Sequence, residues 1–202
     1  MAISENSQDT RANTQAPTLK PAKPRDGRKA SVSLRGKFDT DRSGTGKSNI
    51  YRQVRKNFFP ATGMHRFHVI DSPVAFIRHA GSFAKFQGLG AIKQFAKSFS
   101  RRRPCYIVLD HGHVVSFGTL SIGFCKDYAV EGDAVVIGTV WTIEAMRGKG
   151  LATLAIQEAM NYMIARGRYT FYIDTGVINK PMLRSIEKLG FGEPSGTFVV
   201  VG

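Results

Sequence analysis

The sequence is poor in cysteine and has no long apolar run, and both shortages exclude classes of protein. Its two cysteines, Cys105 and Cys125, are too few for a disulfide framework in 202 residues, and they form no metal-binding spacing with the five histidines. No apolar run approaches the ~20 residues that a membrane-spanning helix needs, and the first residues lack the apolar core of a signal peptide. We therefore predict a cytoplasmic protein without a metal site or a membrane span.

Acidic residues are scarce relative to basic ones, and the imbalance lies in the first half of a chain with net charge +14. Residues 1–60 hold thirteen Lys/Arg against five Asp/Glu, and residues 61–103 hold eight Lys/Arg against one Asp. Residues 104–202 are nearly balanced, with eight Lys/Arg and nine Asp/Glu. This asymmetry favours nucleic acid or another acidic partner for residues 1–103, and a solvated basic tail is the alternative.

Residues 1–60 are predicted to be a polar, basic and mostly disordered extension, and residues 61–202 to be the folded domain. Apolar residues are sparse before Phe58 and Phe59, so the extension cannot bury enough surface to offset its ordering entropy. Residues 41–48 end like a nucleotide-binding P-loop. That motif needs Gly at position 41, which is Asp, and a preceding strand, which is absent, so we interpret the stretch as a linker.

The rest of the chain mixes predicted strands with predicted helices. Alternating or continuous apolar patterns predict strands at 67–70, 105–110, 114–120, 135–143, 169–174 and 196–201. Helical spacing predicts helices at 74–86, 89–99, from 151 to near 167, and 180–189. This order predicts an α+β fold with a mixed α/β sheet.

The most informative stretch is a strand, a turn and a helix between Val135 and Ala165. The strand is apolar and β-branched, and the turn that follows carries Arg147 and Lys149 beside Gly148 and Gly150. The first amides of the helix have no partner within the helix, and the helix dipole places positive charge there. Glycine lets an anion approach the backbone, so the stretch predicts a phosphate site; a simple tight turn is the alternative.

Two motifs in this half of the chain resemble those of the GNAT acyltransferase superfamily. The stretch from Arg147 to Ala152 resembles the signature Arg/Gln-x-x-Gly-x-Gly/Ala. Downstream, Asn179 opens a predicted helix that leads to Gly190 and Phe191, which is similar to the second landmark of the family. The resemblance covers roughly residues 65–202. It implies a GNAT-like acyl-CoA acyltransferase fold with a disordered basic N-terminal extension.

The resemblance implies an N-acetyltransferase that moves an acetyl group from acetyl-CoA to a primary amine of an acceptor. The positive charge of the chain favours an anionic acceptor. The resemblance implies that the strand end formed by Trp141, Thr142 and Ile143 splays from its neighbour and pairs its backbone with the pantetheine arm. It also implies that the turn holds the pyrophosphate, and that Asn179 contacts the cofactor arm or orders the cleft. Core packing of Trp141 and helix capping by Asn179 are the alternatives. The implied cofactor-binding residues are Trp141, Thr142, Ile143, Arg147, Gly148, Lys149, Gly150, Leu151, Ala152 and Asn179. Removal of residues 1–60 is expected to leave this binding intact.

The catalytic residues are less clearly marked. Many family members place a Tyr, as the acid that reprotonates the thiolate, four residues before the Gly of the second landmark, where this chain has Ile186. Tyr172 and Glu144 are the first candidates for a catalytic role, each with a structural alternative. Further candidates are Asp110, His111 and His113. A competing hypothesis is a nucleic-acid-binding or acidic-partner-binding protein built on an inactive or regulatory acyltransferase-like fold.

Overall fold

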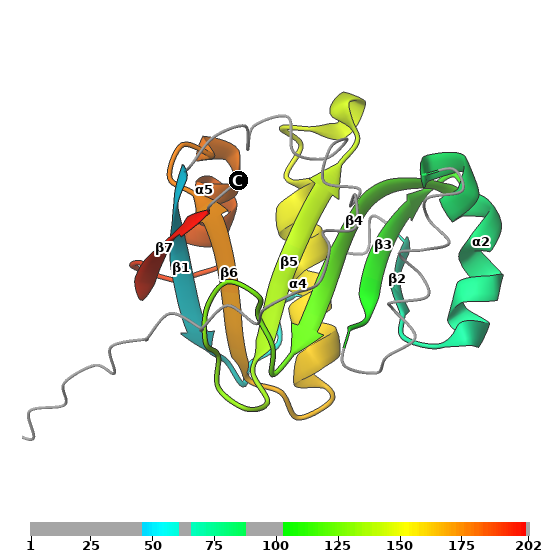
Figure 1. The fold of residues 1–202 in the computed structure, drawn as a ribbon. Helices are drawn as coiled ribbons and strands as arrows, with labels where there is room; N and C mark the ends of the chain where they lie inside the picture. The colour runs from blue at the N-terminus through cyan, green and yellow to red at the C-terminus, as the bar shows by residue number, and fades with distance from the viewer. Residues whose placement is uncertain (1–45, 61–65, 88–102, 201–202) are drawn as a thin grey trace, which may run out of the picture.

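The computed structural model describes residues 46–60, 66–87 and 103–200, and a seven-stranded sheet forms the centre of the molecule (Figure 1). The strand order is β2-β3-β4-β5-β6-β1-β7, and the β5–β6 pair is parallel while the other neighbours are antiparallel. The strands are β1 (Gly46–Val54), β2 (Arg66–Ile70), β3 (Cys105–Asp110), β4 (His113–Ile122), β5 (Val135–Thr142), β6 (Thr170–Gly176) and β7 (Gly196–Val200). The predicted α+β class with a mixed sheet is confirmed.

Helices cover both faces of the sheet (Figure 1). Two of them, α4 (Leu151–Ile164) and α5 (Lys180–Lys188), share one apolar core with the sheet, and α2 (Pro73–Gln87) packs on the other face over β3 and β4. The Ser72 hydroxyl accepts a hydrogen bond from the amide of Ala75 at 3.2 Å, so it caps the N-terminus of α2. The helix predicted at 89–99 lies outside the described residues.

The predicted start of the folded domain at residue 61 is wrong, because β1 is a strand inside the sheet. It pairs with β6 on one side and β7 on the other, and Ile50 is only 2% exposed. Phe59 is also buried, and its amide donates to Asn161 Oδ1 at 2.8 Å. The sequence of β1 is mostly polar, but backbone pairing on both sides needs no apolar run. The predicted disorder of residues 1–45 falls outside the described residues.

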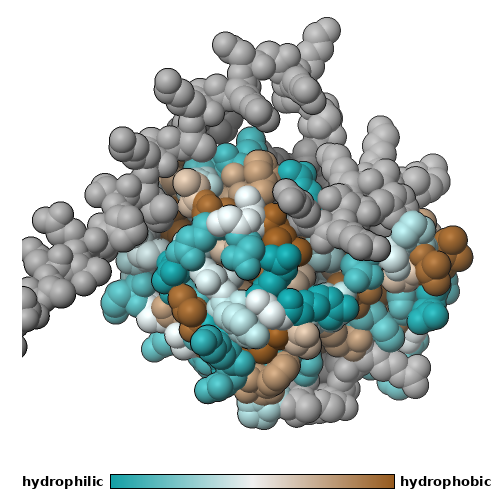
Figure 2. Space-filling view, turned by 90° about the horizontal axis from the view of Figure 1, so that it is seen from below, coloured by the Kyte–Doolittle hydropathy of each residue, from teal (hydrophilic) through white to brown (hydrophobic). Residues whose placement is uncertain are grey.

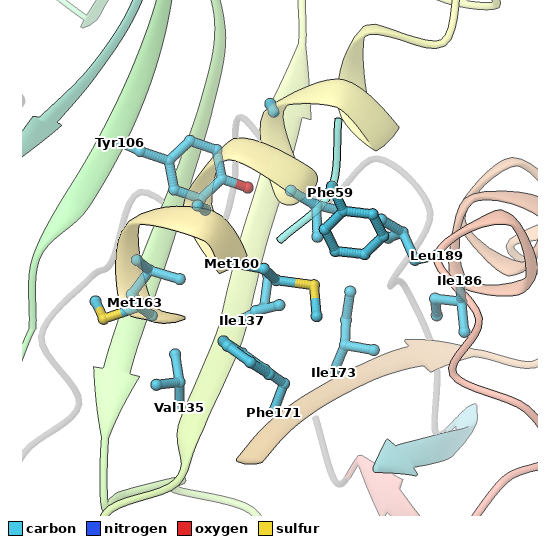
Figure 3. Close-up of a cluster of buried hydrophobic side chains, with 14 of the residues drawn as sticks. Phe59, Tyr106, Val135, Ile137, Met160, Met163, Phe171, Ile173, Ile186 and Leu189 are labelled. Carbon is cyan, nitrogen blue, oxygen red and sulfur yellow. The ribbon is translucent and has the colours of Figure 1, made fainter. Parts of the chain in front are cut away.

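The main core lies between the sheet and the two helices α4 and α5 (Figure 3). Alternation along the strands turns Ile137 of β5 and Phe171 and Ile173 of β6 toward α4, which contributes Met160. These side chains are at most 1% exposed. Each contributes about 1.5–3 kcal/mol by leaving water, so this core holds β5, β6 and α4 together around the site described below.

Gly118 of β4 is required by the ring of Tyr106, and its replacement is predicted to destabilise the fold. A Cβ at Gly118 would lie 2.2 Å from both Cζ and the hydroxyl oxygen of Tyr106, which is fully buried. We expect Gly118→Ala to lower the free energy of unfolding by about 3 kcal/mol, measured by urea denaturation. The matched control is Gly81→Ala, where nothing lies within 4 Å inside α2. That change should be neutral or stabilise by up to about 1 kcal/mol. Equal stabilities of the two variants would contradict the packing described.

A cavity of about 430 Å³ opens near the C-terminal end of α4, between α4 and the start of α2. It is lined by Asp71, Ser72, Pro104, Ile122, Tyr162, Met163, Arg166 and Arg168. Figure 2 shows the end of the molecule at which β5 and β6 converge, and hydrophilic and hydrophobic residues are interspersed over the coloured part of this surface. The hydroxyl of Tyr162 donates to Asp71 Oδ2 at 2.6 Å, which links α4 to the segment before α2.

This hydrogen bond predicts an alkaline loss of stability. Burial and the bond to Asp71 raise the pKa of Tyr162 to about 12, above the ~10 expected in the unfolded chain. The contribution of Tyr162 is therefore complete below about pH 10 and is lost as the pH rises toward 12. We expect Tyr162→Phe to cost about 1 kcal/mol at neutral pH and progressively less above about pH 10. Urea denaturation across this pH range tests it, with Tyr169→Phe, at an exposed position, as the control. A constant difference between wild type and Tyr162→Phe would contradict it.

Candidate active site

The two central strands separate at one end of the sheet. The parallel pairing of β5 with β6 covers only Val135–Ile137 and Phe171–Ile173. Beyond it, β5 stays paired with β4 and β6 stays paired with β1. The two strands therefore diverge toward their C-terminal ends, as Figure 1 shows. This divergence is the one expected for the strand that ends at Trp141, and we call it the β5–β6 gap.

A bulge in β5 lies beside this gap. Gly138 pairs with Thr119 and Trp141 pairs with Phe117, so two residues of β5, Thr139 and Val140, oppose one residue of β4. Thr139 has a φ of 40°, in the left-handed region. A bulge bends the strand and turns its backbone out of the ladder. The bulge lies just beyond the last pair of β5 with β6, where the two strands separate.

Backbone groups of β5 face the gap beyond the bulge. The amide of Ile143 donates to the Val115 carbonyl at 3.0 Å, and the Trp141 carbonyl accepts from the Ser116 hydroxyl at 2.8 Å, so both residues turn to β4. Because successive residues of a strand alternate, the backbone groups of Val140 and Thr142 turn toward β6. Of the three residues predicted to pair with a pantetheine arm, Thr142 is thus the one whose backbone faces the gap.

The side chain of Trp141 packs on the α2 side of the sheet. Its ring lies 4.3 Å from that of Phe86 in α2, measured between ring centroids. It pairs across the ladder with Phe117, which belongs to the core beneath α2. Trp141 therefore packs at the edge of this core, which is the alternative role considered for it. Its indole also borders the gap on the face opposite α4.

The turn after β5 leads directly into the N-terminus of α4. Gly148 and Gly150 both have a φ of 77°, and a Cβ at either would meet nothing within 4 Å. Gly150 is the residue that precedes α4, and no side chain caps the helix there. The first backbone bond of the helix runs from the Leu154 amide to the Gly150 carbonyl at 3.1 Å. The amides of the three residues between them have no helical partner, so they are available to an anion.

Two exposed cations flank these amides. Arg147 Nε donates to the Thr142 carbonyl at 3.3 Å, and Lys149 Nζ lies 3.6 Å from the sulfur of Met146. Leu151 is buried, so it offers its amide and not its side chain. The turn thus combines open space over two glycines, helix amides, the helix dipole and positive side chains, and it fits phosphate groups. The six residues from Arg147 to Ala152 form this turn and the start of α4, and their binding of a cofactor stays a prediction.

The second landmark lies in α5. The Asn179 side chain is exposed, and its Oδ1 accepts a hydrogen bond from the Met182 amide at 3.3 Å. Asn179 therefore caps the N-terminus of α5, which is the alternative role considered for it. Ile186, at the position where many relatives have Tyr, is 1% exposed and packs in the main core near Leu189 (Figure 3). An alkyl side chain cannot donate a proton, so this position supplies no acid.

The structure does not bring the two candidate catalytic residues together. Tyr172 is 2% exposed on the face opposite α4, and its hydroxyl donates to Glu131 Oε1 at 3.3 Å. Glu131 also forms an ion pair with Arg52 at 2.6 Å. Burial raises the pKa of Tyr172 above its usual value. Tyr172 pairs with Val136, before the strands diverge, whereas Glu144 is exposed at the start of the turn beyond β5.

The further candidates lie on the hairpin between β3 and β4. Asp110 ends β3, His113 begins β4, and His111 lies between them with a φ of 47°. Nε2 of His111 lies 3.7 Å from Asp110 Oδ1. Because β5 lies between β4 and the gap, the hairpin does not border the gap.

One group near the gap is missed by sequence reasoning. Asp174 is the first residue of β6 after the last pair with β5, and the hydroxyl of Tyr128 donates to its Oδ2 at 3.2 Å. Tyr128 belongs to the β4–β5 connection, whose sequence from Lys126 to Asp133 is mostly polar. Yet it is 4% exposed and packs against Tyr172 and Phe198. An isolated large aromatic within a polar connection is the signal that could have identified it.

Two further findings concern the described ranges only. Within residues 46–60, 66–87 and 103–200, no helix combines the length and the apolar character needed to cross a bilayer. In the same ranges, no three His, Cys, Asp or Glu side chains lie together in a way that could hold a metal ion.

Comparison with known proteins agrees with this geometry. Residues 80–191 match the model of the acetyltransferase (GNAT) family. A search of curated protein sequences gave no significant match. Among solved structures, a putative GNAT-family acetyltransferase from Novosphingobium aromaticivorans aligns with a TM-score of 0.51 and 17% identity, over 76% of this chain and 62% of that one.

Two other solved structures share the fold. The aminoglycoside N-acetyltransferase AAC(6')-Iy in complex with CoA aligns with a TM-score of 0.52 and 14% identity, over 70% of this chain and 95% of that one. A ribosomal-protein-alanine N-acetyltransferase from Brucella melitensis biovar Abortus aligns with a TM-score of 0.51 and 14% identity, over 68% and 99%. Since the family model covers more than half of the sequence, the chain belongs to the acetyltransferase (GNAT) family.

Proposed function

We propose that the protein is an acetyl-CoA-dependent N-acetyltransferase that acetylates a primary amine. The observation that carries this proposal is the continuity of β5, the turn and α4. A strand with backbone groups turned to the gap runs directly into a turn that fits phosphate groups. A ligand with an extended amide-containing arm and a pyrophosphate has the same two features in the same order.

Each part of the site has a role in this proposal. The amides of Leu151 and Ala152, with Arg147 and Lys149, hold the pyrophosphate, and the glycines leave room for it. The backbone at Val140 and Thr142 pairs with the pantetheine arm as a neighbouring strand would. Asn179 opens α5 beside this arm. Bound acetyl-CoA would supply an activated thioester, and the protein would orient it for attack by the amine.

The reaction needs a neutral amine, a stabilised carbonyl oxygen and a proton for the departing thiolate. Since Ile186 cannot donate that proton, we propose that the thiolate takes it from water at the open end of the gap. Tyr172 and Glu144 stay predictions as catalytic residues. The hydroxyl of Tyr172 is engaged by Glu131, and Glu144 lies at the turn and not beside the last β5–β6 pair.

Calorimetric titration with acetyl-CoA tests the proposal. We expect saturable binding with a Kd on the order of micromolar, and at least 100-fold weaker binding of S-acetyl-pantetheine, about 2.7 kcal/mol, because it lacks the pyrophosphate. No binding at about millimolar acetyl-CoA (Kd weaker than about 1 mM) would rule the proposal out. Equal affinities for the two ligands would contradict the phosphate role of the turn.

The acceptor is proposed only as a primary amine. The structural neighbours include enzymes named for aminoglycosides and for a ribosomal protein, which share such an amine. The predicted preference for an anionic acceptor rests on residues 1–103, and much of that charge lies outside the described residues. The same holds for the predicted binding of nucleic acid or an acidic partner. Salt-dependent binding of RNA or DNA without any acetyl transfer would favour that alternative.

A further inference from the structure

The position of Asp174 in the sheet places it at the point where β5 and β6 separate. Ile137 and Ile173 form the last pair of these two strands, and Asp174 follows on β6, where it pairs only with Ile50 of β1. Its side chain is half-buried. Alternation turns Phe171 and Ile173 to the core beneath α4 and therefore turns Asp174 to the opposite face. The carboxylate thus borders the gap at its narrow end.

The β4–β5 loop holds this carboxylate in place. Tyr128 comes from that loop, which Figure 1 shows on the side of the sheet opposite α4, and its hydroxyl donates to Asp174 Oδ2 at 3.2 Å. Burial and the neighbouring carboxylate raise the pKa of Tyr128 well above its usual range, so the hydroxyl stays protonated and remains a donor. Contacts of the ring with Tyr172 and Phe198 fix its position. The carboxylate is therefore oriented by a rigid, buried partner.

The surroundings of the gap on this face suit an alkylammonium group. Trp141 borders it on the β5 side, with Phe86 of α2 packed against the indole, and Asp174 borders it on the β6 side. The other nearby carboxylate of the loop, Glu131, is engaged by Arg52 at 2.6 Å and by the hydroxyl of Tyr172. An ammonium group is attracted to an aromatic face and to a carboxylate. The turn that fits phosphate belongs to α4 on the other face, so this face is left for the acceptor.

We propose that Asp174 binds the ammonium group of the acceptor and accepts its proton, with Tyr128 as the residue that positions the carboxylate. This inference rests on the proposed acetyltransferase function and adds the acceptor side of the same site. The inference assigns the acceptor to the face formed by Trp141, Tyr128 and Asp174. The acceptor is then a primary amine that binds in its protonated, cationic form.

The reaction is balanced in protons and electrons. The ammonium gives one proton to the Asp174 carboxylate, and the lone pair so freed attacks the thioester carbon, forming the C–N bond. The C–S bond breaks with its electron pair on sulfur. The second nitrogen proton passes to water as the amide forms, and the thiolate takes one proton from water to become the thiol. Asp174 then returns its proton to solvent, so one proton is released per acetyl group transferred.

The test compares two small nucleophiles with the full-length chain. Methylamine is an ammonium ion at about pH 7.5 and needs a base, whereas hydroxylamine is largely neutral and does not. Release of the CoA thiol from acetyl-CoA is measured with each at high concentration. We expect Asp174→Asn to lower transfer to methylamine by about 100-fold and transfer to hydroxylamine by less than about 3-fold. Its Kd for acetyl-CoA, measured by calorimetry, should stay within about 2-fold of wild type.

Two variants serve as controls. Asp127→Asn removes an exposed carboxylate from the same loop and should leave both rates unchanged. Tyr128→Phe keeps the ring packing and removes the donor to Asp174; it should lower the methylamine rate by about 10-fold and spare the hydroxylamine rate. It also keeps the test open if Asp174→Asn fails to fold.

The possible outcomes separate the two proposals. Equal losses with both nucleophiles, no loss in Asp174→Asn, or a wild type that binds acetyl-CoA and transfers to neither nucleophile would each overturn the role of Asp174. A wild type that does not bind acetyl-CoA would instead overturn the proposed function, whatever the variants do.

Discussion

Replacement of Gly150 by Glu is expected to abolish detectable acetyl-CoA binding, with a loss of at least 100-fold in affinity. Gly150 precedes α4 with a φ of 77° and open space around its Cβ position. A carboxylate there would lie against the helix amides that we assign to the pyrophosphate, and it would neutralise the helix dipole. A 100-fold loss corresponds to about 2.7 kcal/mol, which one misplaced charge beside two phosphates supplies. Calorimetric titration measures it.

Gly167→Glu is the matched control for this prediction. Gly167 follows the other end of α4 and has nearly the same backbone, with a φ of 75° and nothing within 4 Å of its Cβ position. A side chain at either glycine costs about 1–2 kcal/mol of backbone strain, so both variants should lose similar stability. Only Gly150→Glu should lose acetyl-CoA affinity. Folded Gly150→Glu protein with wild-type affinity would refute the placement of the pyrophosphate.

Removal of residues 1–60 is expected to unfold the domain, contrary to the sequence-based expectation that it would leave cofactor binding intact. This truncation deletes β1 and Phe59 and leaves β6 and β7 without their shared neighbour. Ile50, Tyr51 and Phe59 are each at most 8% exposed. At about 1.5–3 kcal/mol per buried side chain, their loss approaches the whole free energy of unfolding of a typical domain, about 5–15 kcal/mol. Circular dichroism and thermal denaturation measure the effect.

The control for this truncation is a chain that begins at residue 46. It keeps every contact of β1 described above, so we expect it to melt cooperatively and to bind acetyl-CoA within about 2-fold of the full-length chain. A folded protein that starts at residue 61 would show that β1 is dispensable. A large loss of affinity in the chain that starts at residue 46 would instead place part of the cofactor site in residues 1–45.

Sequence reasoning succeeded where a local pattern decides the structure. The apolar run at 135–143, the glycines at 148 and 150 and the capping position of Asn179 each specify one element, and β5, the turn and α5 appear where predicted. Since strand, turn and helix are contiguous, their order was also predicted correctly, while phosphate binding by the turn stays a prediction. The assignment of Tyr172 and Glu144 to catalysis, and the cytoplasmic location, stay predictions.

Local sequence patterns do not predict contacts between residues far apart in the chain. β1 is recognisable only through its pairing with β6 and β7, because its own sequence alternates weakly and carries several polar residues. Asp174 lies 46 positions from Tyr128, and neither has a local signal for the bond they share. The role of a residue beside the gap depends on where β5 stops pairing with β6, which no periodicity encodes.

The pairing of β1 also has a consequence for how the protein is made. Ser48 lies opposite Gly176 and Phe198, so the first described strand needs partners that are synthesised more than a hundred residues later. While the ribosome makes the intervening chain, β1 has neither neighbour and its backbone groups remain unpaired. Contacts of such large sequence separation slow folding. We therefore expect the half-sheet β6-β1-β7 to form last, after β2, β3, β4 and β5 have assembled.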